Sequence, residues 1–196
     1  SVTRAGSASG GTSGGGAGGG VVLPGGTSGG GTDTPSGGTF VDVPEGSYCF
    51  DAVEWAVENG ITGGVDGTHF DPGSPCSRAQ AVTFLWRAAG KPAPESREMP
   101  FTDVPAGAYC YDAVLWAVEQ GITRGTTDTT FSPYALCSRS HIVAFLYRAQ
   151  GSPAAASDNP FADVRPGSFY YQAALWAVGE GVTYGATATT FAPDTL

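Results

Sequence analysis

A repeat of about 60 residues constrains what this 196-residue chain can fold into more than any other feature. The motif Phe-x-Asp-Val begins at Phe40 and returns 61 and then 60 residues further along. Each copy also has a tryptophan in an Ala- and Val-rich segment, followed later by Phe-x-Pro. In the three copies these signals start at Phe40, Phe101 and Phe161, at Trp55, Trp116 and Trp176, and at Phe70, Phe131 and Phe191.

Each copy predicts two helices joined by a turn-rich loop. In the first copy, apolar residues recur at helical spacing from Asp51, a good N-cap, to Gly60, a residue type that ends helices in left-handed backbone. The second helix is predicted to start with a capping box formed by Ser77 and Gln80. Because about 50 residues cannot bury the apolar faces of such a unit, we expect the repeats to pack together, with Trp55 against a neighbouring repeat.

The sequence thus predicts a mainly α fold of tandem helix-loop-helix repeats. Residues 1–39 are almost entirely Gly, Ser and Thr and predict a disordered linker, because they offer too little apolar surface to bury. The third copy stops at Leu196, before its second helix, and we interpret this end as a truncation. The predicted boundaries are 1–39 for the linker and 40–94, 98–155 and 158–196 for the three repeats.

Charge and residue types exclude several functions. Nine Lys and Arg against 18 Asp and Glu give a net charge of −9 without a basic stripe, so neither nucleic acid nor an anionic membrane is an expected partner. No apolar run approaches the roughly 18 residues of a membrane span. The two histidines, His69 and His141, occupy unrelated places in the repeat. No combination of residues supplies a base, a nucleophile and an oxyanion site, so we predict no catalysis, metal or cofactor.

The repeated motifs resemble those of the S-layer homology family, whose repeat combines F-x-D-V, G-I-x-x-G, F-x-P and T-R-A-E. The resemblance covers residues 40–196 and implies a pseudo-threefold bundle with grooves between neighbouring repeats. In the first copy the matching segments are Phe40-x-Asp42-Val43, Gly60-Ile61-Thr62-Gly63-Gly64, Phe70-x-Pro72 and Cys76-Ser77-Arg78-Ala79-Gln80.

The resemblance also implies a function, which is binding of a secondary cell wall polysaccharide through an acidic, ketal-pyruvate sugar. The arginine of T-R-A-E contacts that sugar in the family, and helix N-termini suit anions. Each position also has a purely structural interpretation: the arginines as solvated helix starts, the aspartates as turn caps and the glycines as backbone requirements. The implied polysaccharide-binding residues are Arg78, Arg139, Asp42, Asp103, Asp163, Gly64, Gly125 and Gly185.

Some positions depart from the family pattern. Gln80 still suits a capping box, whereas His141 in the second copy is expected to fit that role poorly. The cysteine pairs Cys49/Cys76 and Cys110/Cys137 are each separated by 27 residues, which leaves an intra-repeat disulfide open. Because they stand where the family often has Ala and Ile, we favour buried small apolar residues instead.

The leading functional hypothesis is attachment of a larger extracellular protein to the bacterial cell wall. An alternative is a protein–protein or adhesin module, and a third is the non-catalytic tail of a secreted glycan-degrading enzyme. The missing helix of the third repeat is expected to expose Trp176, Ala173 and Val178 and to favour self-association. The aromatic residues that an adhesin would use are Tyr109, Tyr111, Phe169 and Tyr170.

Overall fold

The computed structural model describes residues 38–155 and 158–196, so the predicted linker lies outside the described residues except for its last two positions. As predicted, the described chain is mainly helical, and it contains no strand longer than an isolated bridge. None of its helices has the length and apolar character needed to cross a membrane. The helices are α1 (Phe50–Glu58), α2 (Arg78–Ala88), α3 (Tyr111–Glu119), α4 (Arg139–Ala149) and α5 (Tyr171–Gly179).

The helix ends follow the predicted signals with one exception. Ser77 caps α2, since its Oγ accepts from the Gln80 backbone N–H and its own N–H donates to the Gln80 side chain. Gly60 follows α1 with φ of +65°, as a helix terminator requires. The predicted cap at Asp51 is wrong. Cys49 is the N-cap of α1 and makes no side-chain cap bond. Asp51 lies in the first turn, where its negative charge interacts favourably with the helix dipole.

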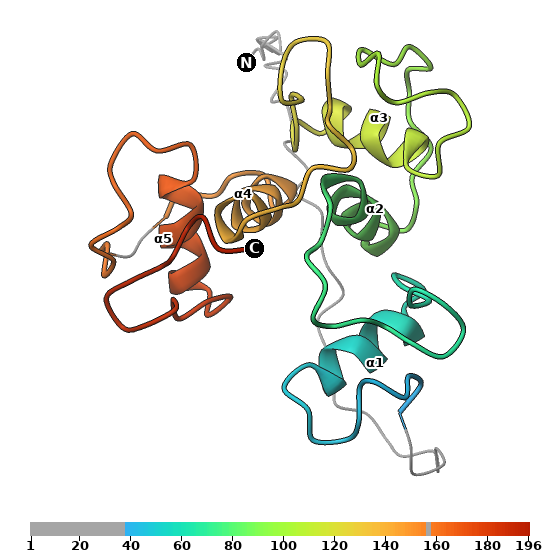
Figure 1. Cartoon of the computed structure of the whole chain (residues 1–196). Coiled ribbons are helices and arrows are strands. Elements are labelled where there is room, and N and C mark those ends of the chain that lie inside the picture. The colour runs from blue at the N-terminus through green and yellow to red at the C-terminus, as the bar shows by residue number, and fades with distance from the viewer. Residues whose placement is uncertain (1–37, 156–157) are drawn as a thin grey trace, which may run out of the picture.

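The helices of one repeat pack against helices of the next repeat. Contacts join α2 to α3, α4 to α5 and α2 to α4, whereas α1 packs against no other described helix. Figure 1 shows α2 and α4 at the centre, with α1, α3 and α5 around them. Each second helix therefore covers the first helix of the following repeat, and the packed unit is offset from the sequence repeat.

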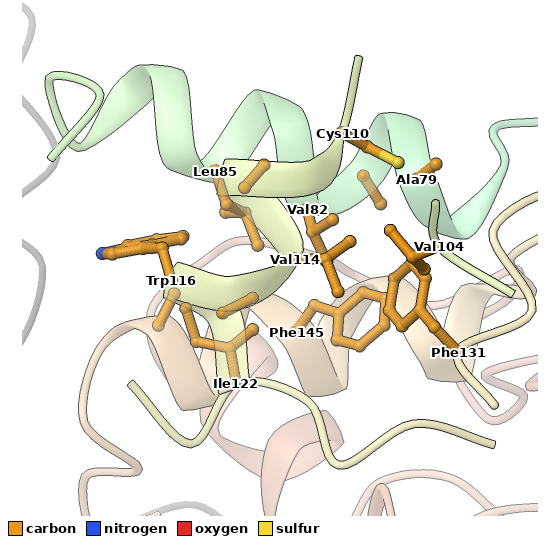
Figure 2. Close-up of a cluster of buried hydrophobic side chains, with 14 of the residues drawn as sticks. Ala79, Val82, Leu85, Val104, Cys110, Val114, Trp116, Ile122, Phe131 and Phe145 are labelled. Atoms are coloured by element: carbon orange, nitrogen blue, oxygen red, sulfur yellow. The ribbon is translucent and has the colours of Figure 1, made fainter. Parts of the chain in front are cut away.

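The largest core cluster lies where α2 meets α3 (Figure 2). Val82 and Leu85 of α2 pack with Val114 and Trp116 of α3, and Phe145 of α4 joins them. Full burial of one such side chain contributes roughly 1.5–3 kcal/mol to folding, so this cluster holds the first two repeats together.

The expected exposure of the third repeat is wrong. Trp176 is only 9% exposed and Ala173 is buried, because α4 covers α5 in the same way that α2 covers α3. The helix left without a cover is α1, where Ala52 is exposed and Trp55 partly exposed. The expectation assumed that each first helix packs with the second helix of its own repeat, whereas it packs with that of the preceding one. The described residues therefore give no support to the predicted self-association through the third repeat.

This arrangement predicts that equivalent tryptophans contribute unequally to stability. Trp116, 3% exposed, packs between α2 and α3, so Trp116→Ala should lower the free energy of unfolding by about 3–5 kcal/mol. Trp55→Ala should cost clearly less, since Trp55 is partly exposed and α1 packs against no other described helix. Urea unfolding of the two variants measures both values, and equal costs would show that α1 is covered in solution.

Candidate functional site

Arg78 joins the first repeat to the second. It is the first residue of α2, its side chain is 6% exposed, and its Nε donates to the Phe131 carbonyl oxygen at 2.9 Å. Its Nη2 donates to Thr123 Oγ1 at 3.4 Å, and its guanidinium lies 4.9 Å from the centre of the Phe131 ring. The backbone N–H of Arg78 also donates to the Ala135 carbonyl, at 2.9 Å. The interpretation of Arg78 as a solvated helix start is therefore wrong.

Arg139 repeats this arrangement between the second and third repeats. Its Nε donates to the Phe191 carbonyl oxygen at 2.9 Å and its Nη2 to Thr183 Oγ1 at 3.2 Å. Its guanidinium lies 5.1 Å from the centre of the Phe191 ring, and its backbone N–H donates to the Thr195 carbonyl at 2.8 Å. Both predicted arginines are thus inter-repeat connectors, whatever else they bind.

The three predicted aspartates each close a loop within their own repeat. The carboxylate of Asp103 accepts from the backbone N–H groups of Phe131 at 2.8 Å and Ser132 at 2.7 Å. Asp42 and Asp163 bind the equivalent pairs of N–H groups in their repeats. The N–H groups of the Phe70 loop lower the pKa of Asp42, as expected for a carboxylate that accepts such bonds. These bonds support a structural role for the three aspartates as caps of their loops. Their contact with a ligand stays a prediction.

The three predicted glycines are required by the backbone. Gly125 has φ of +85°, and a Cβ there would lie 2.5 Å from both Phe101 Cε1 and the Thr130 carbonyl oxygen. Gly64 and Gly185 have φ of +78° and +83° and meet the equivalent phenylalanine ring just as closely. A larger residue would push the Phe-x-Asp-Val segment away from the loop, so these glycines fix the loop shape.

Three arginines line a groove of about 640 Å³ formed by the start of α2, the 121–126 loop and α4; we call it the basic groove. Arg78 forms part of its wall, and Arg124 is exposed at the loop. Arg148 of α4 donates from Nη1 to the Ile122 carbonyl oxygen at 3.2 Å. Among the described residues, no carboxylate lies within ion-pair distance of these three guanidinium groups. Burial lowers the pKa of Arg148, and the positive charge of nearby Arg124 lowers it further.

His141 lies in the same groove and corrects a second expectation. Its Nδ1 accepts from the Ser138 backbone N–H at 3.2 Å and lies 2.9 Å from Ser138 Oγ, so the imidazole takes the place that Gln80 has in α2. Accepting this bond requires an unprotonated Nδ1. Burial, and then the charge of Arg78, lower the pKa of His141. The prediction that His141 suits a capping box poorly is therefore wrong at neutral pH.

The equivalent groove of the first repeat, about 760 Å³, is less basic. Arg87 corresponds to Arg148 and donates to the Ile61 carbonyl oxygen at 2.9 Å, but Gly63 stands where the second repeat has Arg124. Arg139 lines a different groove of about 410 Å³, with Cys76 and Cys137. Of the predicted residues, Arg78 and Gly125 are thus brought together in the basic groove and Arg139 is not.

Sequence reasoning missed Arg124 and Arg148. Arg124 occupies a variable position of the Gly-Ile-Thr-x-Gly segment, where the other copies have Gly63 and Tyr184, so the repeat pattern drew no attention to it. Arg148 repeats as Arg87 before an alanine near the end of the second helix. Comparison of the copies position by position, with attention to repeated cations, would have found Arg148.

Asp103→Ala should destabilise the protein, because two backbone N–H groups would lose a charged acceptor. We expect the free energy of unfolding to fall by about 2–3 kcal/mol, measured by urea unfolding. Asp128→Ala, an exposed carboxylate in the same repeat, is the control and should change stability by less than about 0.5 kcal/mol. A similar loss for both variants would contradict the structural role of Asp103.

His141→Gln should flatten the pH dependence of stability. The lowered pKa means that the unfolded chain binds the proton more tightly, so this contribution is fully present above about pH 6.5 and is lost as the pH falls through the folded pKa. Glutamine restores the cap of the first repeat without a titrating group. Urea midpoints at pH 7.5 and pH 5 should therefore differ less for His141→Gln than for the original chain, and an unchanged difference would contradict this role of His141.

Residues 39–82, 100–142 and 160–196 match the S-layer homology domain. A surface-layer 125 kDa protein of Lysinibacillus sphaericus is 33% identical over 144 residues, which are 72% of this chain and 12% of that protein. The S-layer protein sap of Bacillus anthracis is 30% identical over 115 residues, or 58% and 14%. An endoglucanase of Bacillus sp. (strain KSM-635) is 31% identical over 100 residues, or 51% and 10%.

The chain therefore spans only a small part of these relatives. The three matched segments nevertheless cover more than half of the chain, and each contains the first helix of one repeat. Such domains and their S-layer relatives indicate a location at the bacterial cell surface. The chain belongs to the S-layer homology domain family.

Proposed function

We propose that the three repeats form a non-catalytic anchor that binds an acidic polysaccharide of the cell wall in the basic groove. The observation that carries this proposal is the convergence of Arg78, Arg124 and Arg148 without a paired carboxylate, in a chain of net charge −9. Three like charges in one groove repel each other, so an anion that enters relieves this repulsion.

The chemistry of the groove suits a carboxylate carried on a sugar, such as a pyruvate ketal. A guanidinium group binds a carboxylate through two parallel hydrogen bonds, which gives both affinity and orientation. Arg78 is held rigidly by the Phe131 carbonyl, whereas Arg124 is exposed and can adjust to the ligand. Phe169, 58% exposed, lines the same groove and offers an apolar ring face for the sugar.

The cargo of this anchor is proposed from the relatives. They include surface-layer proteins and an endoglucanase, each much longer than the part that matches. We infer that the chain attaches a larger protein, either a lattice protein or a glycan-degrading enzyme. Of the aromatic residues that an adhesin would use, Tyr109 is 60% exposed and supports that role. Tyr111 and Tyr170 are partly buried, and Phe169 lies in the basic groove, so these three do not form a separate aromatic surface with it.

Arg124→Ala should weaken binding to purified wall polysaccharide by roughly 10-fold or more, about 1.5–3 kcal/mol for a hydrogen bond to a charged group. Arg124 makes the sharpest test, since Arg78→Ala would also remove the bond to Phe131. Stability of the Arg124 variant should stay within about 0.5 kcal/mol of the original chain. Arg97→Ala removes an exposed arginine that pairs with Asp112 outside the groove, and should bind normally.

Co-sedimentation with wall material and titration with the soluble polysaccharide measure these effects. Binding should also fall as salt rises, because exposed charges are screened. Mild acid treatment that removes pyruvate should abolish binding if the acidic sugar is the ligand. Unchanged binding by both Arg124→Ala and Arg148→Ala would overturn the basic groove as the site.

A further inference from the structure

Two cysteines from different repeats face each other across a short antiparallel pairing. The Arg78 backbone N–H donates to the Ala135 carbonyl at 2.9 Å, and the Cys137 N–H donates to the Cys76 carbonyl at 2.8 Å. These bonds flank an antiparallel bridge between Ser77 and Leu136. In this register Cys76 lies directly opposite Cys137.

The pairing brings both cysteine side chains to one face. Directly opposed residues of an antiparallel pair project their side chains to the same side, with Cα atoms about 5.5 Å apart where they share a backbone hydrogen bond, as Cys76 and Cys137 do. This separation lies within the roughly 4.4–6.8 Å that a disulfide spans. The register of the two backbones is therefore one that a disulfide can span.

The surroundings of the two thiols agree with this placement. Both line the groove of about 410 Å³ that also contains Arg139, and both pack against the core cluster of α2 and α3. Burial raises the pKa of the Cys137 thiol to about 11, with a further contribution from the nearby Cys76 thiol. Cys76 is the more exposed of the two, whereas Cys137 is 3% exposed.

The other two cysteines occupy a different position in the repeat. Cys49 and Cys110 are the N-caps of α1 and α3. Cys110 is buried in the core beside Ala79 (Figure 2), and Cys49 packs with the small cluster around Phe40. The backbone register therefore favours pairing between repeats over the pairing within repeats that the 27-residue spacing suggested.

We propose that Cys76 and Cys137, which are thiols in this structure, form a disulfide that links the first two repeats at the oxidising cell surface. A small-molecule or protein disulfide serves as the oxidant. The Cys76 thiolate attacks it, forms a mixed disulfide and releases one thiol; the Cys137 thiolate then attacks the Cys76 sulfur and releases the second. Two cysteine thiols lose two protons and two electrons, and one oxidant disulfide becomes two thiols.

The bond would fix the start of α2 against the second repeat. Arg78 is two residues after Cys76 and already contacts Phe131 and Thr123. A disulfide would oppose transient separation of the first two repeats and so preserve this contact. It would also close a loop that includes α2 and α3. Its main effect is expected on the unfolded chain, whose freedom it restricts.

The experiment uses the full 196-residue chain, purified reduced and then equilibrated with glutathione disulfide. Digestion with a protease that cuts after glutamate separates the four cysteines onto peptides 46–54, 59–95, 99–119 and 120–180. Mass spectrometry under non-reducing, acidic conditions should find 59–95 joined to 120–180, with Cys49 and Cys110 still open to alkylation after unfolding. Oxidation should raise Tm by roughly 5–15 °C.

Matched variants make the assignment falsifiable. Cys76→Ala and Cys137→Ala should each lose the oxidation-dependent rise in Tm, whereas Cys49→Ala and Cys110→Ala should keep it, even if Cys110→Ala lowers Tm in both states. Four alkylatable thiols after oxidation would overturn the proposal. So would peptide 46–54 joined to 59–95, 99–119 joined to 120–180, or a disulfide between chains. These outcomes do not depend on polysaccharide binding, so they test the bond separately from the proposed function.

Discussion

The arginine that begins each second helix connects one repeat to the next. Arg78 brings a buried positive charge to the Phe131 carbonyl, and the backbone N–H groups of Arg78 and Ala79 donate to carbonyls of the same loop. A helix N-terminus has N–H groups without partners inside the helix, and here the following repeat supplies the acceptors. The same arrangement at Arg139 shows that the connection is a property of the repeat.

The connection decides which apolar surfaces are covered. Because α2 is anchored to the second repeat, its Val82 and Leu85 pack against α3, and α4 likewise covers α5. The first repeat has a first helix that no preceding repeat covers within the described residues, and its cluster is small: Phe40, Val43 and Val53. The residue at position 54 agrees with the uncovered state of α1. It is the polar Glu54, which accepts hydrogen bonds from Thr39, whereas the equivalent residues of α3 and α5 are the buried Leu115 and Leu175.

Local signals in the sequence predicted the positions of the helices well, but they did not predict which helix packs against which. The capping box at Ser77 and the turn at Gly60 are determined by residues close in the chain, so composition and spacing suffice to predict them. An apolar stripe, however, says which face of a helix is buried and leaves open which helix buries it. Arg124, which lines the proposed site, was not predicted for a related reason: it is specific to one copy, so a search for repeated motifs passes over it.

The binding role proposed for Arg78 is compatible with its structural role, because the two use different properties of one side chain. Its Nε and Nη2 bind the second repeat, while its charge adds to that of Arg148 in the basic groove. A side chain already fixed by folding loses little conformational entropy when an anion arrives, so its contribution to affinity comes at low cost. The first-repeat groove has only Arg87 among the arginines, and no preceding repeat supplies an equivalent of Arg78 within the described residues. Affinity for an acidic ligand should therefore depend on a groove that needs two consecutive repeats, so that a single isolated repeat would not bind.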